Sequence, residues 1–330
     1  MRLLAIILTL IIFATNLNAQ SLKDLQSKLN AIGFWSGNPD GVMGKKTKHG
    51  IESFLRYTAA DRSINYSIPQ LVKLANEFRT DFQDIKSGEF FNGQNSWEIL
   101  PSSAPNSITV TDDPLGTFND KIYKFTLPSG YCDDRKYQGY ETSDCYYNST
   151  RTLLGDTYGV QPKQAWYQWH IFLPKNYPIG GVQANGGMSL VYFKGNCPTG
   201  EGGEHLSFGI PFKDLQFQKY LNLVFDYECG TNFRASQKLI EVEKLLGRWT
   251  KFELFVKWSN KKDGQIKVFI NEEEVFTHKG TTIQRGNPSF NQFRFGQYLC
   301  CTISVDRIKE AEIYYADVVR ANSREGLKKK

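Results

Sequence analysis

The stretch Gln292-Phe293-Arg294-Phe295-Gly296-Gln297-Tyr298 has the alternating pattern of a β-strand. Because successive side chains of a strand point to opposite faces, Arg294 and Tyr298 share one face with the glycine between them. Phe293 and Phe295 share the other face, which belongs in a hydrophobic core. The first face offers a fixed cation, a phenol that can move a proton, and room for a sugar ring at the glycine. Such a face suits an anionic, hydroxyl-rich chain, and a cross-strand ladder on a solvated sheet is the alternative.

Short aromatic and β-branched runs, separated by Gly, Pro, Asn and Asp, fill the chain from Gly88 onward. Lys262–Gln265 has the pattern of a hairpin turn between two of them. Many strands joined by turns, with no long helix, predict a mainly β domain of the sandwich or jelly-roll type over residues 89–322. Besides the stretch quoted above, the predicted strands are Lys121–Leu127, Trp166–Leu173, Met188–Phe193, Leu221–Tyr227, Trp249–Trp258, Gln265–Ile270 and Ile313–Val319.

Residues 1–19 have the pattern of a secretory signal peptide. A positive charge at Arg2 precedes the apolar run Ala5–Ala14, and Ala19 is a small residue at the expected cleavage site. The apolar run is too short for a comfortable membrane span, and no second run follows. We therefore expect a secreted or periplasmic protein whose mature chain begins near Gln20 and has no membrane span.

The cysteines indicate disulfides, because an even number in an exported chain usually pairs. Cys132 with Cys145 would close a short local loop, and Cys197 with Cys229 is a second candidate pair. The neighbours Cys300–Cys301 cannot be assigned to a pair. Scarce histidines and the lack of a C-x-x-C pair argue against a zinc site. No metal and no cofactor are expected.

The chain carries a formal net charge of +6. This modest positive balance suits an acidic glycan as partner. No nucleic-acid partner is expected. Residues 323–330 end in three lysines and are predicted to form a solvated basic tail.

Residues 20–58 have the pattern of a small helical unit. Leu25 and neighbouring leucines recur at helical spacing, Gly33–Gly44 is rich in turn formers, and Thr47 is a candidate cap of a second helix that carries Phe54. The pattern L-Q-x-x-L, G-F-W-x-G-x-x-D-G-V-x-G, T and I-x-x-F resembles the peptidoglycan-binding-like domain. This resemblance implies a helical module that targets an enzyme to a cell wall. A linker or docking module with the same fold is the alternative.

Residues 59–88 are predicted to form a helical connector. An amphipathic pattern supports this prediction, because apolar residues recur at helical spacing and charged residues occupy the other face. The apolar face comprises Leu71, Leu74, Ala75, Phe78 and Phe82.

The order of segments in residues 89–322 resembles that of the heparin-lyase-like and glucuronan-lyase-like polysaccharide lyases. Trp166–Pro174 also has that family's early W-x-x-W-x-x-x-L-P pattern. The resemblance implies a concanavalin-like β-jelly-roll sandwich behind the small N-terminal all-α module. The other segments that carry the resemblance are Gly247–Thr250, Val268–Asn271, Phe293–Tyr298 and Ile313–Val318.

The resemblance also implies a reaction, β-elimination at a uronic acid. A cation or amide neutralises the C5 carboxylate, a base removes the C5 proton, and a tyrosine returns a proton to the leaving O4. The product carries a 4,5-double bond, and the chemistry needs no metal. The implied substrate is an anionic, uronate-containing polysaccharide.

Three strand motifs carry the site in related jelly-roll uronan lyases, and the first two are altered here. The motif Arg-Ser/Thr-Glu-Leu is matched by Arg151–Leu154, in which Leu153 replaces the acid. The motif Gln-x-His is matched by Tyr192–Lys194, in which Lys194 replaces the histidine.

The third motif, Tyr-Phe-Lys-x-Gly-x-Tyr, is matched by the opening stretch. Arg294 takes the place of its lysine, and Tyr298 takes the place of its catalytic tyrosine. The predicted site residues are Tyr298 as proton donor or base, Lys194 as base or carboxylate partner, Arg151 and Arg294 as carboxylate binders, and Tyr192 and His170 as residues that line the groove.

The lysine in the place of the usual base leaves three alternatives. Lysine is normally protonated at neutral pH, but burial beside an arginine would lower its pKa enough for it to act as a base. Lys194 could instead neutralise the carboxylate and leave both proton transfers to Tyr298. The site could also bind without catalysis. His205 is a further candidate base, and Arg151 could serve only to fix a neighbouring loop.

The prediction for the whole chain is an exported polysaccharide lyase that acts on an acidic polysaccharide, with peptidoglycan as a second candidate partner. Glu201 and Glu204 do not form the paired-carboxylate motif that a glycoside hydrolase needs. One alternative is a non-catalytic glycan- or wall-binding protein on the same scaffold. A structural envelope protein that uses both modules for protein contacts is the other alternative.

Overall fold

The computed structural model describes much of the chain from Ala19 onward. The candidate Cys197–Cys229 pair, Cys300–Cys301, Glu201 and the apolar run of the predicted signal peptide lie outside the described residues. The described residues are 19–30, 34, 36–57, 64–77, 79–81, 97–99, 103–104, 106–134, 144–146, 149–156, 163–178, 187–196, 202–211, 219–226, 234–283, 292–299 and 309–328.

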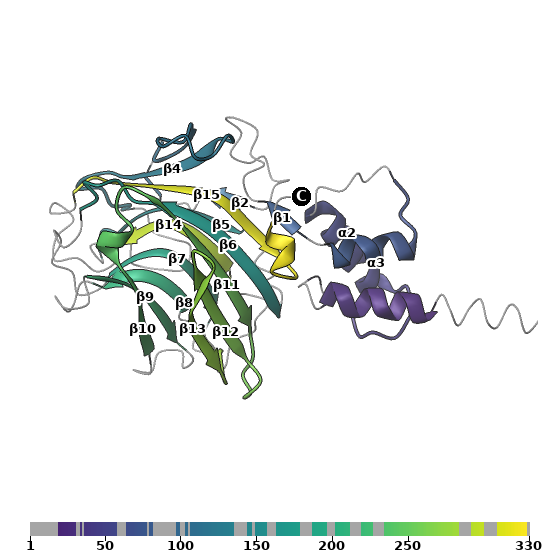
Figure 1. Cartoon of the computed structure of the whole chain (residues 1–330). Coiled ribbons are helices and arrows are strands. Elements are labelled where there is room, and N and C mark those ends of the chain that lie inside the picture. Colours follow the sequence, from purple (N-terminus) through teal and green to yellow (C-terminus); the bar gives the residue numbers. More distant parts are fainter. Residues whose placement is uncertain are drawn as a thin grey trace, which may run out of the picture.

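Two antiparallel sheets pack face to face and form the main body of the protein (Figure 1). In sheet A the strands follow the order β13 (Glu273–Lys279), β12 (Gln265–Ile270), β11 (Trp249–Lys257), β6 (Gln164–Phe172), β15 (Ala311–Ala321), β4 (Ile122–Leu127) and β3 (Ile108–Thr111), and β1 (Arg79–Asp81) also pairs with β15. In sheet B they follow the order β10 (Arg234–Glu241), β9 (Tyr220–Asp226), β8 (Gly202–Pro211), β7 (Gly187–Asn196), β14 (Gln292–Leu299), β5 (Thr150–Asp156) and β2 (Trp97–Ile99). The predicted mainly β sandwich is confirmed, and each predicted strand is present with small differences at its ends.

The hydrophobic core between the sheets explains the alternating patterns of the sequence. In β11 the side chains of Phe252, Leu254 and Val256 point into this core and are fully buried. The intervening Lys251 and Glu253 point outward and pair with each other at 3.0 Å. The turn predicted after this strand leads into the antiparallel partner β12. Period-two patterning therefore assigns each strand residue to the core or to the outer face.

Gly296 interrupts the alternation of strand β14. The register of β14 against β7 shifts between Phe295 and Tyr298, and Gly296 has a φ of 132°. A Cβ atom at this position would lie 2.2 Å from the backbone oxygen of Thr152 and 2.9 Å from the ring of Phe125. The expectation that this glycine leaves room for a sugar ring is therefore wrong. The glycine is needed for a β-bulge and for close packing against the core.

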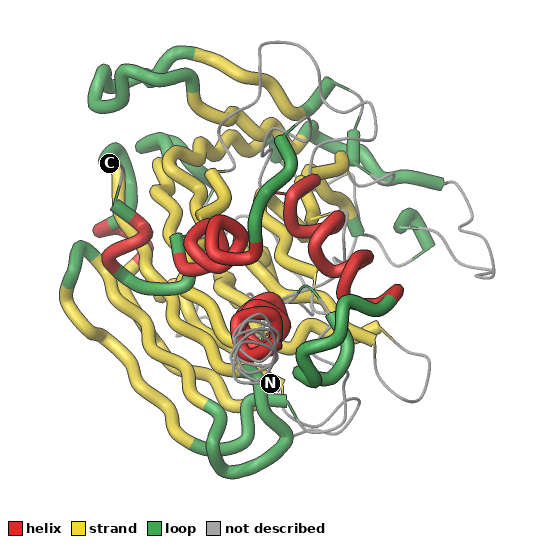
Figure 2. Tube along the Cα trace, turned by 90° about the vertical axis from the view of Figure 1, so that its right-hand side faces the viewer, coloured by secondary structure: helices red, strands yellow, loops and turns green. Residues whose placement is uncertain are grey.

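Three helices lie at one end of the sandwich, where Figure 2 views them in front of the strands. They are a first helix over residues 19–30, α2 (Lys45–Tyr57) and α3 (Ile68–Asn76). Gln26 organises the loop between the first two helices, since its amide donates hydrogen bonds to Asp40 and Thr47 at 3.0 Å and accepts one from the Gly41 N–H at 2.8 Å. The helices share a core of Leu22, Leu25, Leu29, Phe34, Phe54, Leu71 and Ala75.

The segment predicted as a helical connector is divided between the two parts of the protein. Helix α3 ends at Asn76 and packs into the core of the helical unit. Arg79–Asp81 then forms β1 and pairs with β15, so the chain here follows the sheet rather than the helical pattern. The Asn322 side chain, just after β15, donates a hydrogen bond of 2.6 Å to the carbonyl of Ala75.

The C-terminal segment differs in part from the predicted solvated tail, because Arg324 and Leu327 pack on the outer face of sheet A while Lys328 is exposed. It contains a short 3₁₀ helix, η4 (Glu325–Leu327), in which Leu327 is buried. The Arg324 guanidinium lies 3.9 Å from the ring centroid of Phe269 and donates from Nε to Glu253 at 2.9 Å. Because a buried carboxylate without a cationic partner is costly, the ion pair between Glu253 and Arg324 holds the segment against the sheet.

The disulfide predicted between Cys132 and Cys145 is confirmed, with a Cα–Cα distance of 5.0 Å. It closes the loop that leads from β4 toward β5. Among the helices of the described residues, none has the length and apolarity needed to cross a membrane.

Candidate functional site

The three sequence motifs of the predicted site lie on adjacent strands of sheet B. Strand β14 pairs with β5 on one side and with β7 on the other. Tyr298 is opposite Arg151 of β5, and Arg294 is opposite Tyr192 of β7. Residues far apart in the sequence therefore become neighbours through strand pairing.

Their side chains lie on the outer face of this sheet, on the side away from the core. Phe293 and Phe295 belong to the core cluster between the sheets. Leu153 and Tyr192 form a separate small cluster against which Tyr298 packs. We call the residues Arg151, Tyr192, Arg294 and Tyr298 the sheet B cluster.

The two tyrosines and two arginines of this cluster contact one another. The rings of Tyr192 and Tyr298 have centroids 6.2 Å apart. The Arg151 guanidinium lies 4.4 Å from the centroid of the Tyr298 ring, and that of Arg294 lies 5.7 Å from the Tyr192 ring. Each phenol is thus flanked by a cation, which favours its ionised form.

Arg151 is paired with an acid that motif comparison did not identify. Its Nε donates to Asp144 Oδ2 at 2.7 Å, and its Nη2 donates to Oδ1 of the same carboxylate. The side chains of Arg151 and Asp144 are 16% and 6% exposed. Burial alone would lower the pKa of Arg151, but electrostatic attraction to Tyr298, Tyr192 and Asp144 raises it above its usual range. Asp144 is thus the carboxylate partner of Arg151 among the described residues.

Arg294 has neutral hydrogen-bond partners among the described residues. Its Nε donates to Gln292 Oε1 at 2.8 Å, and its Nη1 lies 3.4 Å from the Tyr192 hydroxyl. No carboxylate of the described residues forms an ion pair with Arg294. Its charge is therefore held in place but not neutralised there, in contrast to that of Arg151.

Lys194 lies on the same side of β7 as Tyr192, two residues further along the strand. It is opposite Gln292 of β14 and opposite Glu204 of β8. Its side chain is half-buried. The register thus places the predicted base or carboxylate partner within the same three-strand region. The side chains of Glu204 and His205 lie outside the described part of the structure.

His170 does not join this cluster, which corrects the prediction that it lines the same groove. It lies on β6 of sheet A, whose neighbouring residues Trp169 and Ile171 face the core as predicted. His170 therefore faces outward from sheet A, where its ring lies 5.1 Å from that of Phe118. Burial lowers the pKa of His170 to about 4, although Asp317, 3.8 Å away, opposes this shift. Alternation predicts a face, not the sheet to which a strand belongs.

A polar row that motif comparison missed continues from the cluster across sheet B. In strand register Tyr298 is opposite Ser189, Ser189 is opposite Gly209, and Gly209 is opposite Asn222. Asn222 is fully buried, and neither its Nδ2 nor its Oδ1 has a hydrogen-bond partner among the residues that the structure describes. The sequence contained a signal for this residue, because the amide of Asn222 stands between two core leucines, Leu221 and Leu223.

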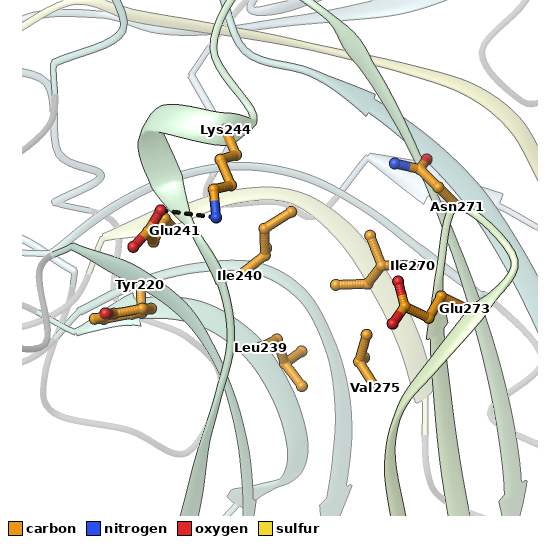
Figure 3. A pocket seen from close by; sticks show the side chains of 9 residues that line it. All are labelled: Tyr220, Leu239, Ile240, Glu241, Lys244, Ile270, Asn271, Glu273 and Val275. Atoms are coloured by element: carbon orange, nitrogen blue, oxygen red, sulfur yellow. Dashed lines mark ion pairs between the residues drawn. The ribbon is translucent and has the colours of Figure 1, made fainter.

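A cavity of about 380 Å³ lies elsewhere, where the edge strand β10 of sheet B meets the β12–β13 turn of sheet A (Figure 3). Leu239, Ile240 and Val275 provide apolar lining, and Glu241 and Lys244 form an ion pair of 3.0 Å beside it. Strands β9 and β8 separate β10 from β7, so the cavity is distinct from the sheet B cluster. Among the described residues, no group of acidic, histidine or cysteine side chains could hold a metal ion.

Comparison with known proteins identifies the family. The family model described as polysaccharide lyase matches residues 86–319. A search of curated protein sequences gave no match. An endo-β-1,4-glucuronan lyase from the fungus Trichoderma reesei has a similar structure, with a TM-score of 0.51, 14% identity, and coverage of 74% of this chain and 95% of that chain. At this identity the likeness shows the fold alone.

Two alginate lyases are among the other structures found. The lyase from Chlorella virus has a TM-score of 0.41 and 12% identity, and the match covers 69% of this chain and 93% of that chain. For the lyase from Aplysia kurodai the TM-score is 0.39 and the identity 10%, with 68% and 90% covered. The family model covers most of the chain, including all three motif strands. The chain belongs to the polysaccharide lyase family.

Proposed function

We propose that this protein is an exported lyase that cleaves a uronate-containing polysaccharide by β-elimination on the outer face of sheet B. The observation that carries the proposal is the sheet B cluster, in which two adjacent phenols lie beside a cation with neutral partners. A uronate needs a cation for its carboxylate, and its C5 proton and O4 leaving group need a group that can both accept and donate a proton.

Arg294 is the proposed binder of the substrate carboxylate. Its hydrogen-bond partners among the described residues, Gln292 and Tyr192, are uncharged, so a carboxylate can pair with it without displacing an ion pair of that part of the chain. Neutralising the carboxylate lowers the cost of forming a carbanion at C5. Lys194, in the same region of β7, is the proposed second cation for this group.

Tyr298 is the proposed catalytic residue. As a phenolate it takes the C5 proton, the electrons of the C5–H bond form the C4–C5 double bond, and the C4–O4 bond breaks. The same phenol then gives its proton to O4, so the tyrosine ends in its starting state. Arg151 beside the ring stabilises the phenolate, and because it already pairs with Asp144, we assign it this role in place of carboxylate binding.

The substrate chain is proposed to run across the strands, over the row that leads to Asn222. Neighbouring strands are about 4.8 Å apart, so Asn222 on β9 is roughly 14 Å from Tyr298 on β14. That span corresponds to a few sugar units. Its amide suits a sugar hydroxyl or carboxylate, but Asn222 is fully buried, so this contact requires the groups that cover it to move.

Incubation of the mature protein with glucuronan, alginate and heparin tests this function. The expected result is ultraviolet absorbance from a 4,5-unsaturated product on at least one of these polymers. Binding to an acidic glycan without any unsaturated product would overturn the lyase proposal in favour of the non-catalytic glycan-binding alternative. Reducing-end formation without the absorbance would indicate hydrolysis instead.

The helical unit is proposed to hold the enzyme on peptidoglycan. Two apolar residues of its ordered loop, Val42 and Met43, are 60% and 41% exposed. Replacing both with aspartate is expected to reduce co-sedimentation with insoluble peptidoglycan. Leu115 on the sandwich is 50% exposed, and Leu115→Asp is the matched control that keeps binding. Equal sedimentation of all three proteins would contradict this role.

A further inference from the structure

We infer that Asp144 is a positioning residue that holds Arg151 against the phenol of Tyr298, and that the Cys132–Cys145 disulfide holds Asp144 in place. The inference rests on the proposed function only where it predicts how a change at Asp144 alters enzyme turnover. Its structural part concerns the ionisation of one tyrosine, which is measurable without substrate.

The contact between Asp144 and Arg151 restricts the guanidinium in two directions. The carboxylate receives hydrogen bonds from Nε and Nη2 of Arg151, a side-on bidentate pair. The guanidinium carbon of Arg151 lies over the Tyr298 ring, 4.4 Å from its centroid. A guanidinium held by a carboxylate through Nε and Nη2 stays beside the ring, whereas an arginine without this acid could turn to solvent.

The disulfide restricts Asp144 in turn. Asp144 directly precedes Cys145, whose sulfur is bonded to that of Cys132. The backbone is also tied on both sides, since the Cys145 N–H donates to the Asp133 carbonyl at 3.1 Å and the Ser149 N–H donates to the Asp144 carbonyl at 2.8 Å. The carboxylate is thus delivered to the sheet by a covalently closed loop.

Within the described part of the chain, the charged and titratable groups around Tyr298 come from three strands and this loop. Arg151 lies on β5, Tyr192 on β7, and Arg294 on β14 beside Tyr192, while Asp144 lies behind Arg151. Removing Asp144 has two opposite electrostatic effects on the phenol. Loss of the anion alone favours the phenolate, whereas release of Arg151 from the ring disfavours it. The sign of the change therefore reports whether Asp144 positions Arg151.

The test is a spectrophotometric titration of the Tyr298 phenol, obtained as the difference between each protein and its Tyr298→Phe counterpart. Asp144→Asn is expected to shift this titration to higher pH, on the order of one pH unit, as Arg151→Gln does. The double variant is expected to shift it no further than Arg151→Gln alone, because Asp144 acts through Arg151. A shift to lower pH, no shift, or additive shifts would overturn the inference.

Asp112→Asn is the matched control. Asp112 pairs with Lys121, with both side chains largely exposed, so the same chemical change is made at a solvated ion pair. It is expected to leave the Tyr298 titration and the turnover unchanged. In the lyase assay, Asp144→Asn is expected to lower kcat about tenfold or more with a smaller change in KM. If wild-type protein has no lyase activity, the proposed function fails while the titration still decides this inference.

The role of the disulfide is tested with two proteins: the double variant Cys132→Ser/Cys145→Ser, and native protein treated with dithiothreitol. In the latter the two cysteines become thiols and the reagent becomes its cyclic disulfide. Both are expected to shift the Tyr298 titration in the same direction as Asp144→Asn, by a smaller amount. If Asp144→Asn does not fold, these proteins and Arg151→Gln still give the comparison. An unchanged titration after loss of the bridge would overturn the role of the disulfide.

Discussion

The outer faces of the two sheets carry similar residue types. They differ in whether a carboxylate of the protein pairs with each cation. On sheet A the cation Arg324 is bound to the buried carboxylate of Glu253 and stacks on Phe269, and Lys251 pairs with the same acid. On sheet B, Arg151 is likewise compensated, by Asp144, whereas Arg294 contacts an amide and a phenol. A ring beside a cation is therefore not in itself a binding site.

This difference separates a face that the protein uses for its own stability from one that can accept an anion. The acids on sheet A neutralise their cations, and the C-terminal segment covers part of the face. A substrate carboxylate would have to compete with a buried ion pair there, which is costly. At Arg294, which has only neutral partners in the described part of the chain, it would add a counter-charge. The predictions below test this contrast by making matched changes on both faces.

The largest effect is expected at Tyr298. Tyr298→Phe removes the hydroxyl to which we assign the proton transfers and is expected to lower kcat by a factor of roughly 10² to 10⁴ with little change in thermal stability. Tyr314 on sheet A is the matched control, since its hydroxyl contacts Glu312 at 3.2 Å on the opposite outer face. Tyr314→Phe is expected to keep full activity. Loss of activity in both variants, or in neither, would break the contrast between the faces.

The arginines give the second comparison. Arg294→Gln is expected to lower kcat/KM by roughly 10- to 100-fold, because a charged hydrogen bond to the substrate contributes about 1.5–3 kcal/mol. Its free energy of unfolding should change little. Arg324→Gln is expected to do the reverse: it leaves the buried Glu253 short of a partner and lowers the free energy of unfolding by about 1–3 kcal/mol, with activity preserved. Urea unfolding and steady-state kinetics on both variants decide this.

The histidine of sheet A provides a pH test. Burial lowers the pKa of His170 to about 4, so protonation favours the unfolded state, in which histidine titrates near its ordinary value of about 6.5. The stabilisation is present above pH 6.5 and is lost as the pH falls toward 4, by at most about 3 kcal/mol. His170→Gln should lose less stability over this interval in urea titrations. Parallel curves for the two proteins would contradict the account of His170.

The smallest effect is expected at Asn222. Asn222→Leu replaces a buried amide that lacks hydrogen-bond partners with an apolar side chain of similar size. Stability is expected to stay equal or to increase, since no hydrogen bond of the folded protein is lost. KM for a long polymer is expected to rise a few-fold, with less change for short oligosaccharides. A destabilised variant with unchanged KM would show that Asn222 serves the fold alone.

Much of the fold was predictable because strand alternation is a local property. Phe252 is buried and Lys251 points outward because adjacent strand residues face opposite sides, which the neighbouring sequence already indicates. The bulge at Gly296 was not predictable in this way, because the demand for glycine comes from Thr152 and Phe125, which are distant in the sequence. The docking of the C-terminal segment was missed for the same reason.

The candidate site was predictable in part, through motifs. Arg151, Arg294 and Tyr298 were expected together, and strand pairing places them on one face. His170 was assigned to the same groove because alternation does not distinguish between two sheets. Asp144 was missed because a loop residue carries no periodic signal, and only its hydrogen bonds to Arg151 point to the role that we infer for it.

A crystal structure of the Tyr298→Phe variant with a short uronate oligosaccharide tests the central claim most directly. We predict that a sugar carboxylate lies within hydrogen-bond distance of Arg294, with C5 of that sugar facing the ring at position 298 and the chain running toward Asn222. An oligosaccharide bound on the outer face of sheet A, or only in the cavity beside Leu239 and Val275, would contradict the account.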